Sequence, residues 1–355
     1  MSIFEHRSFD DHEHVAFCHD KITGLQAIIA VHNSNLGQAM GGCRMFGYPS
    51  GDEALNDVLR LSRGMTYKSA AANLPVGGAK SVILGDPRKH KTDELMRAMG
   101  RFIDSLGGLY VGAEDSGMQE RDMKIMAQET QHVAGFALQE GERGDPSPAT
   151  AYGVFIGLQK AVEHKLKTSD LKGVRIAIQG LGNVGYRLAT LLHEAGAELV
   201  VSDIFAANAD RAIHDFNATL VAPEDIFSQP VDVVAPCALG SVIDDVVLNQ
   251  LQAKVIAGSA NNQLAHDDLG MALKARGILY APDYVLNAGG IIDVHYQRQG
   301  MAYAEAHHHI TSSIKGTLDE VFRKSDMSGR STNVIADEVA RHRFDPDFHS
   351  VDDVA

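Results

Sequence analysis

The sequence predicts an α/β protein of two domains, an N-terminal α/β domain and a doubly wound parallel-sheet domain, with a cleft between them. The chain has 355 residues, which is more than one hydrophobic core usually serves. Five near-continuous apolar runs after residue 170 are typical of parallel strands buried on both faces. The segment "GERGDPSPAT" (141–150) is rich in proline and glycine and predicts a boundary. We therefore expect domains over 1–140 and 141–330, with a C-terminal helix end and tail over 331–355.

The first domain alternates strand-like and helix-like segments. Helices are expected over 49–68, where Ser50 and Glu53 form a capping box, and over 92–108, where Thr92 is the N-cap. Short apolar runs predict strands over 25–32, 79–85 and 109–115. In the second domain we expect a helix over 150–166 and strands in "VRIAIQ", "AELVVSD", "VDVVAP", "KVIAGSA" and "GILYAPDYV". After residue 300 the pattern becomes helical and polar, and "FDPDFHSVDDVA" is expected as a loose tail.

Charge and cysteine content restrict the class of protein. The net charge is −14 without a dense run of Lys and Arg, which disfavours binding to nucleic acid or to an anionic membrane. No apolar run approaches the roughly 18 residues of a membrane span, and the acidic N-terminus does not resemble a signal peptide. Cys18, Cys43 and Cys237 are odd in number and widely spaced, so they predict neither a disulfide framework nor a metal site. We expect a cytoplasmic protein.

The strongest local signal is "GLGNVG" (180–185). Gly180, Gly182 and Gly185 follow a predicted strand and open a predicted helix, and the next strand ends at Asp203, 18 residues further on. In such a turn the first glycine makes the bend, the second lets backbone approach a pyrophosphate, and the third lets helix and sheet pack closely. An acid in the position of Asp203 accepts hydrogen bonds from ribose hydroxyls and repels a 2′-phosphate. The motif predicts NAD as cofactor; the alternative is a similar scaffold that binds no nucleotide.

Two lysines stand in the otherwise small and apolar run "MTYKSAAANLPVGGAKSVIL" (65–84). Lys68 and Lys80 could extend along apolar surface with their charges in solvent. Beside a nicotinamide they have another use, since one Lys can hold a carboxylate and a second, desolvated beside another cation, can act as a base. Asp115, at the end of a predicted strand, supplies a carboxylate for an amine or for proton transfer. Together the three groups suit an α-amino acid.

Other reactive side chains give weaker signals. The run His307–His309 falls in a predicted helix, where consecutive residues diverge around the axis, so a solvated face is the expectation rather than a metal site. Cys237 has no base near it in the sequence, which favours a packed thiol at a strand end over a nucleophile.

The ordered motifs of the chain resemble those of the glutamate/leucine/phenylalanine/valine dehydrogenase family, with the leucine-specific members as the most similar branch. The resemblance runs from about residue 10 to about residue 340. Its motifs are "MGGCR" (40–44), "GMTYKSAAANLPVGGAK" (64–80), "AEDSG" (113–117), "DPSPATAYGV" (145–154), "GLGNVG" (180–185), "PCALG" (236–240), "AGSANNQL" (257–264) and "PDYVLNAGG" (282–290). One departure is Ala79, which stands where the family usually has a third glycine before the lysine.

The resemblance implies a role for individual residues. Lys68 binds the substrate carboxylate with help from Asn262, Lys80 is the base that activates water, and Asp115 assists proton transfer at the amino group. Backbone at Gly41 and Gly42 borders the reacting carbon. The implied cofactor-binding residues are Gly180, Gly182, Asn183, Val184, Gly185, Asp203, Thr150, Cys237, Ala238 and Asn261, with Thr150 and Asn261 near the nicotinamide.

The same comparison bears on the substrate. Met40 and Val294 stand where glutamate-specific members hold the side-chain carboxylate with a Lys and a Ser, so glutamate is disfavoured. Ala113, Ala134 and Ile291 complete an apolar pocket. We expect reversible, NAD-dependent oxidative deamination of leucine, valine or isoleucine to a 2-oxo acid and ammonia, with phenylalanine or tryptophan as alternatives. A non-catalytic NAD-binding regulator and a hydroxy-acid dehydrogenase are the alternatives from other classes. The family also implies a homo-oligomer, from dimer to octamer.

Overall fold

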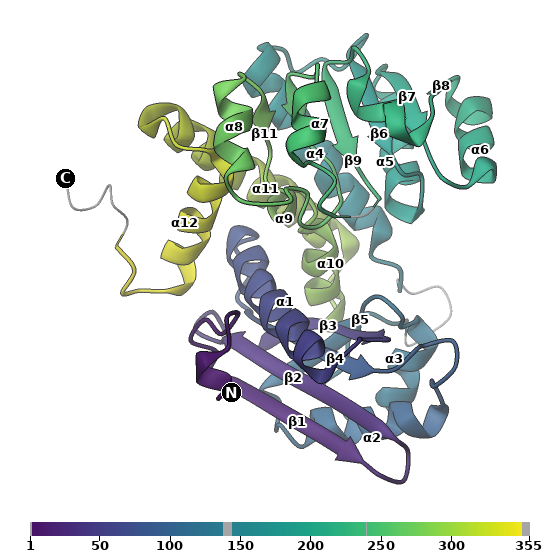
Figure 1. The fold of residues 1–355 in the computed structure, drawn as a ribbon, viewed down its shortest axis with the longest axis vertical. Helices are drawn as coiled ribbons and strands as arrows, with labels where there is room; N and C mark the ends of the chain where they lie inside the picture. The colour runs from purple at the N-terminus through teal and green to yellow at the C-terminus, as the bar shows by residue number, and fades with distance from the viewer. Residues whose placement is uncertain (1, 138–143, 239, 350–355) are drawn as a thin grey trace. The chain divides into compact units, whose positions relative to one another are not determined.

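A computed structural model describes residues 2–137, 144–238 and 240–349. The chain forms two compact units (Figure 1). Unit 1 contains Met1–Asp145, Gln297–Met301 and Ala340–Ala355, and unit 2 contains Pro146–Tyr296 and Ala302–Val339. Near the C-terminus, residues up to 339 therefore belong to unit 2 and residues from 340 to unit 1. The sequence had instead suggested one C-terminal segment over 331–355, outside both domains.

Unit 1 is built on a mixed five-stranded sheet in the order β1-β2-β4-β3-β5. Antiparallel pairing joins β1 to β2 and β2 to β4, and parallel pairing joins β3 to β4 and to β5. The strands are β1 (His14–Asp20), β2 (Leu25–Asn33), β3 (Ala39–Phe46), β4 (Gly77–Leu84) and β5 (Tyr110–Glu114). The helices are η1 (Ile3–Glu5), α1 (Gly51–Ala71), α2 (Asp93–Asp104) and α3 (Glu120–Met126).

Both predicted helix starts of unit 1 are confirmed by their caps. The Ser50 side chain accepts a hydrogen bond from the backbone N–H of Glu53 at 3.1 Å, and Thr92 caps α2 through the N–H of Leu95 at 3.2 Å. Such caps satisfy backbone donors that the first helical turn leaves without partners. The two sheet faces have separate apolar cores, one that includes residues of α2 and α3 and one that includes residues of α1. The sequence reading did not identify β1 or β3, and β3 contains the glycines of "MGGCR".

Unit 2 contains a parallel six-stranded sheet in the order β11-β10-β9-β6-β7-β8. In sequence order this is the arrangement of a doubly wound dinucleotide-binding sheet, whose direction of winding reverses between its first and fourth strands, here β6 and β9. The strands are β6 (Arg175–Gln179), β7 (Glu198–Ser202), β8 (Thr219–Leu220), β9 (Val233–Pro236), β10 (Val255–Ile256) and β11 (Leu279–Tyr280). The prediction of an α/β fold with a doubly wound parallel sheet is confirmed.

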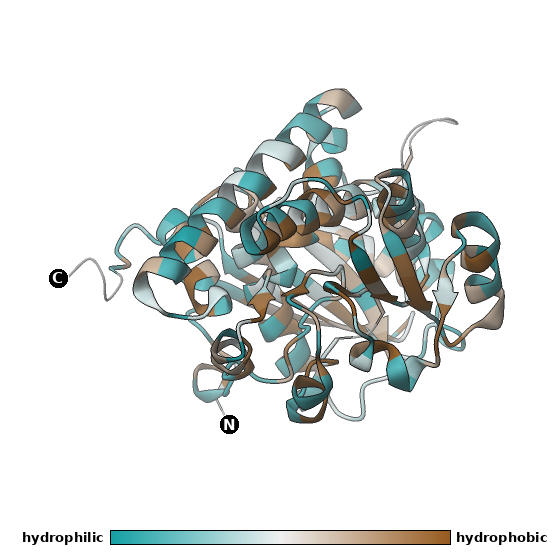
Figure 2. Ribbon diagram, turned by 90° about the horizontal axis from the view of Figure 1, so that it is seen from above, coloured by the Kyte–Doolittle hydropathy of each residue, from teal (hydrophilic) through white to brown (hydrophobic). Residues whose placement is uncertain are grey.

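The helices after residue 146 lie in unit 2, except that the ends of α10 and α12 belong to unit 1. They are α4 (Ser147–Leu166), α5 (Asn183–Glu194), α6 (Ala206–Phe216), η2 (Pro223–Ser228), α7 (Asp245–Gln250), α8 (Leu269–Ala275), α9 (Asp283–Leu286), α10 (Gly289–Arg298), α11 (Tyr303–Ser328) and α12 (Thr332–Phe344). Figure 2 shows hydrophobic residues concentrated on the strands, which agrees with burial on both sheet faces.

The expected loose tail is wrong for its first residue. Phe344 is 5% exposed, its ring packs against Tyr67 with centroids 5.2 Å apart, and its carbonyl accepts a hydrogen bond from Asn35 Nδ2 at 2.9 Å. The segment around Phe344 is polar, but one aromatic ring buries a large apolar area and is enough to fix this end of α12.

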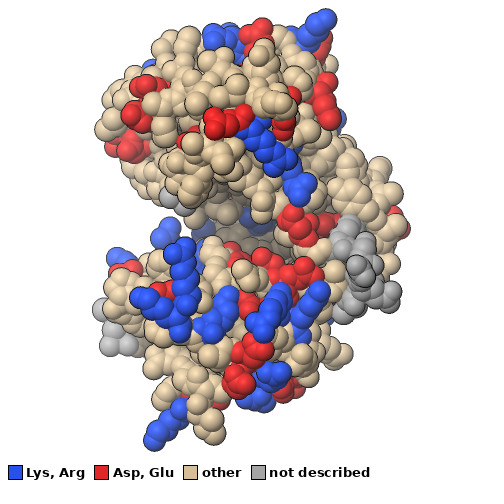
Figure 3. All heavy atoms as spheres, turned by 90° about the vertical axis from the view of Figure 1, so that its right-hand side faces the viewer, with Lys and Arg blue, Asp and Glu red and all other residues tan. Residues whose placement is uncertain are grey.

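The described surface carries both signs of charge. Acidic and basic side chains are interspersed on the face drawn in Figure 3. None of the described helices combines the length and apolar character that a membrane crossing requires.

Candidate active site

Lys80 and Asp115 form an ion pair in unit 1. Lys80 lies on β4 and is only 6% exposed, and its Nζ lies 2.9 Å from Asp115 Oδ2. Asp115 follows directly after β5, so a lysine of one strand meets a carboxylate at the end of another. Burial raises the pKa of the Asp115 carboxyl, but the charges of Lys80 and Arg44 outweigh that effect and lower the pKa to about 2. The carboxylate is therefore ionised at neutral pH.

Two adjacent glycines of β3 lie beside this pair and beside β4. A Cβ on Gly42 would lie 2.6 Å from Asp115 Cβ and 2.9 Å from Lys80 Nζ. A Cβ on Gly41 would lie 1.6 Å from the backbone oxygen of Ala79. Any side chain at either position would push the ion pair or the neighbouring strand away. The resemblance assigned both glycines to the border of the reacting carbon; Gly42 lies at the Lys80–Asp115 pair, and Gly41 lies against the backbone of Ala79 on β4.

The remaining predicted residues of unit 1 lie on the same sheet or beside it. Met40 is buried on β3 opposite Val111 of β5, and Gly42 pairs with Ala113. Ala134 is also buried and its N–H donates to the Gly112 carbonyl at 2.8 Å, which attaches it to the β5 edge. Lys68 is half-buried near the C-terminal end of α1. Ala79, the departure from the family pattern, is fully buried in the core cluster that includes α2 residues, so its methyl group is accommodated.

The glycine loop of unit 2 has the geometry that its motif predicts. Gly180 has φ +91°, which a side chain would disfavour, and a Cβ there would lie 2.7 Å from Ala238 Cβ. A Cβ on Gly185 would lie 2.0 Å from the Gly180 oxygen, so this glycine allows α5 to pack closely on the sheet. A Cβ on Gly182 meets nothing within 4 Å. Packing therefore does not explain Gly182, and open space at the start of a helix suits close approach of a phosphate.

The acid after β7 is part of the same loop. Asp203 Oδ2 accepts a hydrogen bond from the Leu181 N–H at 2.6 Å, and its Oδ1 accepts one from the Phe205 N–H at 2.8 Å. A carboxylate has about four acceptor sites, so these bonds leave capacity for ribose hydroxyls. Gly182 is the N-cap of α5 and makes no side-chain cap bond, and Asn183 and Val184 begin the helix. The residues present therefore fit a dinucleotide.

The end of β9 meets the glycine loop at the point where the winding reverses. The Cys237 N–H donates to the Gln179 carbonyl at 2.7 Å. Ala238 lies next to Gly180, on the side where a side chain at Gly180 would point. Burial raises the pKa of the Cys237 thiol, which keeps it neutral and agrees with the expected packed cysteine. All three cysteines are free thiols. Across residues 2–137, 144–238 and 240–349, no group of three or more His, Cys, Asp or Glu is arranged to hold a metal ion.

Thr150, a predicted nicotinamide residue, lies close to Gly290, which precedes two predicted substrate-pocket residues. Its Oγ1 would lie 2.6 Å from a Cβ on Gly290, at the start of α10. Ile291 and Val294 follow on this helix, half-buried and buried respectively.

Two exposed asparagines lie in another loop of unit 2. Asn261 Oδ1 accepts a hydrogen bond from Asn287 Nδ2 at 2.8 Å, and the Asn262 carbonyl accepts one from the Ser241 N–H at 2.6 Å. Asn262 has φ +51°, a left-handed conformation that asparagine tolerates better than most residues. These contacts fix the loop without burying either predicted side chain.

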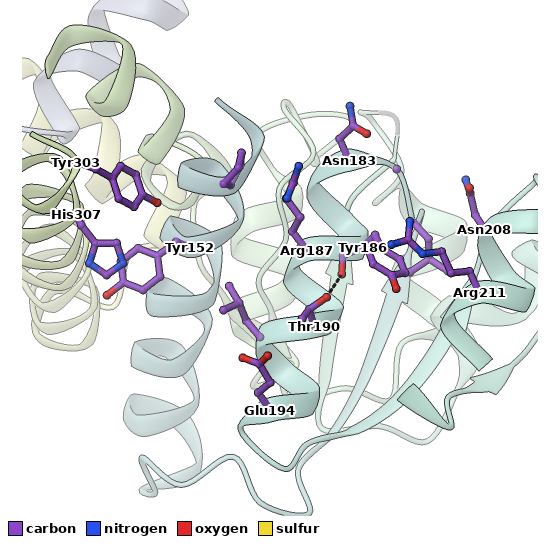
Figure 4. A pocket seen from close by; sticks show the side chains of 14 residues that line it. Tyr152, Asn183, Tyr186, Arg187, Thr190, Glu194, Asn208, Arg211, Tyr303 and His307 are labelled. Carbon is purple, nitrogen blue, oxygen red and sulfur yellow. Dashed lines mark hydrogen bonds between the residues drawn. The ribbon is translucent and has the colours of Figure 1, made fainter. Parts of the chain in front are cut away.

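A pocket of about 660 Å³ lies along α5 in unit 2 (Figure 4). Of the predicted cofactor residues only Gly182 and Asn183 line it, at one end. Most of its wall comes from side chains of α4, α5, α6 and α11 that include Tyr152, Arg187 and Arg211. The pocket therefore meets the glycine loop without containing the predicted nicotinamide residues, and we do not assign the reaction to it.

In the His307–His309 run, for which a solvated face was expected, His307 and His309 are half-buried and each makes a side-chain contact. His307 stacks on Tyr152 with ring centroids 3.6 Å apart, and His309 Nδ1 lies 2.9 Å from the Tyr296 hydroxyl. His308 is exposed. Tyr152, which is distant in sequence, and Tyr296 on α10 supply contacts that the helical pattern could not indicate.

The sequence reading missed three residues that contact the ion pair directly or through one partner. Arg44 Nε donates to Asp115 Oδ2 at 2.9 Å, and its Nη1 donates to Asp57 Oδ2 at 2.9 Å. The Tyr48 hydroxyl also donates to Asp57 Oδ2, at 2.6 Å. The signal was available in "MGGCR", since alternation along a strand places Arg44 on the same face as Gly42.

Comparison with known proteins agrees with this fold and site. Residues 12–132 match the Glu/Leu/Phe/Val dehydrogenase dimerisation domain, and residues 141–210 and 204–337 match the glutamate/leucine/phenylalanine/valine dehydrogenase domain. The chain is 46% identical to a leucine dehydrogenase of Bacillus subtilis over 97% of this chain and 94% of that protein. It is 44% identical to an L-tryptophan dehydrogenase of Nostoc punctiforme over 97% and 96% of the two chains. The crystal structure of L-tryptophan dehydrogenase from Nostoc punctiforme superposes with a TM-score of 0.84 at 42% identity, covering 95% of this chain and 96% of that one.

A parallel nucleotide-binding-type sheet and a buried Lys–Asp pair, together with these matches, define the chain as an amino acid dehydrogenase, an oxidoreductase. It belongs to the glutamate/leucine/phenylalanine/valine dehydrogenase family.

Proposed function

We propose that the chain catalyses the reversible, NAD-dependent oxidative deamination of an apolar L-amino acid, with leucine, valine and isoleucine as preferred substrates. The observation that carries the proposal is the buried Lys80–Asp115 pair beside Gly41 and Gly42. The reaction consumes the amino acid, NAD⁺ and water and yields the 2-oxo acid, ammonium, NADH and a proton. NAD, when bound, accepts the hydride from the substrate Cα.

The side chains of unit 1 manage the protons of this reaction. Lys68 binds the substrate carboxylate, with Asn262 as a second donor. Lys80 in its neutral form takes a proton from the water that adds to the iminium carbon. Asp115, ionised at neutral pH because Lys80 and Arg44 lower its pKa, accepts a proton from the amino group and returns it as ammonia leaves. The backbone of Gly41 and Gly42 borders the reacting carbon.

The choice of NAD over NADP rests on Asp203. Its carboxylate lies at the glycine loop, where a ribose 2′-phosphate would meet a negative charge. The proposed cofactor-binding residues are those of the glycine motif together with Asp203, Thr150, Cys237, Ala238 and Asn261.

The preference for an apolar side chain rests on Met40, Ala113, Ala134, Ile291 and Val294. None of these can pair a glutamate carboxylate, and leaving that charge unpaired would cost several kcal/mol. One methylene changes discrimination by only about 1–3 kcal/mol, so phenylalanine and tryptophan are the alternative substrates. The leucine and tryptophan dehydrogenases among the relatives support the same short list.

We further propose that residues 1–140 form the substrate-binding, catalytic and oligomerisation domain and residues 141–330 the NAD domain of a homo-oligomer, followed by a C-terminal segment. The match of residues 12–132 to a domain described as a dimerisation domain supports self-association. Three free thiols support a reducing, cytoplasmic location.

The test is a substrate panel. The purified chain is incubated with NAD or NADP and, separately, leucine, valine, phenylalanine, tryptophan, glutamate or lactate, and NADH absorbance is followed at alkaline pH. Rapid reduction of NAD with branched-chain amino acids supports the proposal. A faster rate with an aromatic amino acid refutes the pocket assignment, and activity with lactate but with no amino acid refutes the reaction class.

A matched pair of lysine variants tests the role of Lys80. Lys80→Ala should lower turnover about 10²–10⁴-fold, the usual contribution of a general base, while NAD still binds. Lys91→Ala breaks another largely buried ion pair of unit 1, in which Lys91 Nζ lies 2.6 Å from Asp122 Oδ2, and should lower stability but keep turnover. Near-wild-type turnover of Lys80→Ala would refute its role as base.

A further inference from the structure

The carboxylate of Asp115 is shared by two cations. Arg44 Nε and Lys80 Nζ each lie 2.9 Å from the same oxygen, Asp115 Oδ2. On its other side Arg44 Nη1 lies 2.9 Å from Asp57 Oδ2, which also accepts the Tyr48 hydroxyl at 2.6 Å. Positive and negative charges thus alternate from Lys80 through Asp115 and Arg44 to Asp57, and the four formal charges cancel.

The guanidinium of Arg44 is fixed in place and remains charged. Two of its nitrogens bind two different carboxylates, and the hydroxyl of Tyr48 holds the more distant one. Burial lowers the pKa of Arg44, but Asp115 and Asp57 outweigh this effect and raise it. A planar guanidinium suits this task better than a flexible ammonium because its donors diverge at fixed angles.

This arrangement acts on the proton of Lys80. A base must lose its proton, and a carboxylate at 2.9 Å opposes that loss. Arg44 reduces the opposition because it neutralises part of the Asp115 charge and repels the ammonium of Lys80. The two nitrogens bind one oxygen, so they are at most about 6 Å apart, close enough for their charges to interact.

We propose that Arg44 is a positioning residue that shares the Asp115 carboxylate with Lys80 and thereby keeps Lys80 available as the neutral base, with Asp57 setting the strength of this effect. The proposal rests on the proposed function in that it assigns the base role to Lys80. Arg44 acts through Asp115 and need not touch substrate.

Other ionisable groups belong to the elements packed against β4. They include Lys68 and Asp57 on α1, Cys43 on β3, His32 on β2 and Glu114 on β5. Burial raises the pKa of the Cys43 thiol to about 12, so that group stays neutral. Substitution of Arg44 leaves all five in place, and the comparison between variants therefore isolates the guanidinium.

The experiment measures how readily Lys80 loses its proton, without requiring turnover. Wild type and variants are trace-labelled with acetic anhydride from pH 7 to 11, and acetylation of the Lys80 peptide is quantified by mass spectrometry, since only the neutral amine reacts. Arg44→Met should move the midpoint for Lys80 upward by about one to two pH units. Asp57→Asn should move it downward by a smaller amount, because it removes the anion that offsets Arg44.

Tyr48→Phe is the matched control. It removes a hydrogen bond from the same network but no charge, because burial and the Asp57 contact raise the pKa of Tyr48 far above neutral pH, and it should leave the midpoint unchanged. Opposite shifts for Arg44→Met and Asp57→Asn are expected. An unchanged or lower midpoint for Arg44→Met overturns the proposal. If that variant does not fold, Asp57→Asn alone decides, and an upward or absent shift overturns it.

A parallel pH–rate profile with leucine and NAD separates this proposal from the proposed function. The acid limb should move with the labelling midpoint in each variant. The two variants could shift the labelling midpoint in opposite directions while the wild type turns over no amino acid. That result would support the effect of Arg44 on Lys80 and refute the proposed function. Turnover in the wild type with no labelling shift in Arg44→Met would support the proposed function and refute the role of Arg44.

Discussion

Substituting two glycines of one loop separates packing from cofactor binding. In Gly185→Ala the new methyl group would lie 2.0 Å from the Gly180 oxygen and 3.2 Å from Cys237 Cβ. Ordinary contact begins at 3.4 Å, about 1.4 Å more than this separation, and backbone must move to provide it. Overpacking of this kind costs about 1–3 kcal/mol, and the upper end applies because the obstacle is backbone. For a unit of this size the thermal midpoint should fall by about 6–12 °C.

Gly182→Ala should behave in the opposite way. Its Cβ meets nothing within 4 Å, and alanine at an N-cap costs only about 0.5 kcal/mol relative to glycine. The thermal midpoint should stay within about 2 °C of the wild type. The methyl group would instead stand where a pyrophosphate must approach the backbone, so NAD affinity should fall about tenfold or more, or about 1.4 kcal/mol.

The assay combines thermal unfolding by circular dichroism with NAD titration by calorimetry for the same three proteins. Unchanged NAD affinity in Gly182→Ala would refute the assignment of the open space to the cofactor. An unchanged thermal midpoint in Gly185→Ala would refute the packing argument. The two outcomes are independent, since each variant serves as the control of the other.

Two further predictions concern the stability of unit 1. Burial lowers the pKa of His12 from 6.5 to about 4, so the unfolded chain takes up a proton first as pH falls, and stability should be lost between those values by up to about 1.4 kcal/mol per pH unit. In urea unfolding, His12→Gln should flatten this slope and the exposed His14→Gln should not; equal slopes in all three proteins would contradict the reasoning. Arg343 Nη1 donates to the carbonyls of Ala70 at 3.1 Å and Ala71 at 3.0 Å at the end of α1. Arg343→Met should lower the free energy of unfolding by about 1–2 kcal/mol, and no change would show that water replaces both bonds.

The fold followed from the sequence where local signals and burial agree. Helices α1 and α2 were predictable because Ser50 and Thr92 cap them, and the strands of unit 2 because burial on both faces leaves them almost continuously apolar. Strand β3 was not, because Gly41 and Gly42 weaken the strand pattern. A side chain at Gly41 would meet the backbone of Ala79, and one at Gly42 would meet the side chains of Lys80 and Asp115, which local sequence does not reveal.

The candidate site could also be predicted only in part. The glycine motif and the pairing of a lysine with an acid could be predicted from residue types and their order. The position of Arg44 between two carboxylates could not, because it depends on the register that sets β3 beside β5 and on Asp57 of α1. Charged side chains on one sheet face look alike in a sequence, and only the tertiary structure shows which carboxylate each one meets.

The charge balance around Lys80 explains why an amino acid site needs two lysines. Lys80, Asp115, Arg44 and Asp57 together carry no net charge, so they leave nothing to neutralise a substrate carboxylate. The chain as a whole carries −14 and does not attract anions. That field is screened beyond about 8 Å at physiological salt, and a carboxylate must therefore be met by a local cation. Lys68 is the group that the family resemblance assigns to this task. In the proposed mechanism Lys68 holds the substrate carboxylate and Lys80 acts as the base, while Arg44 shares the Asp115 carboxylate with Lys80.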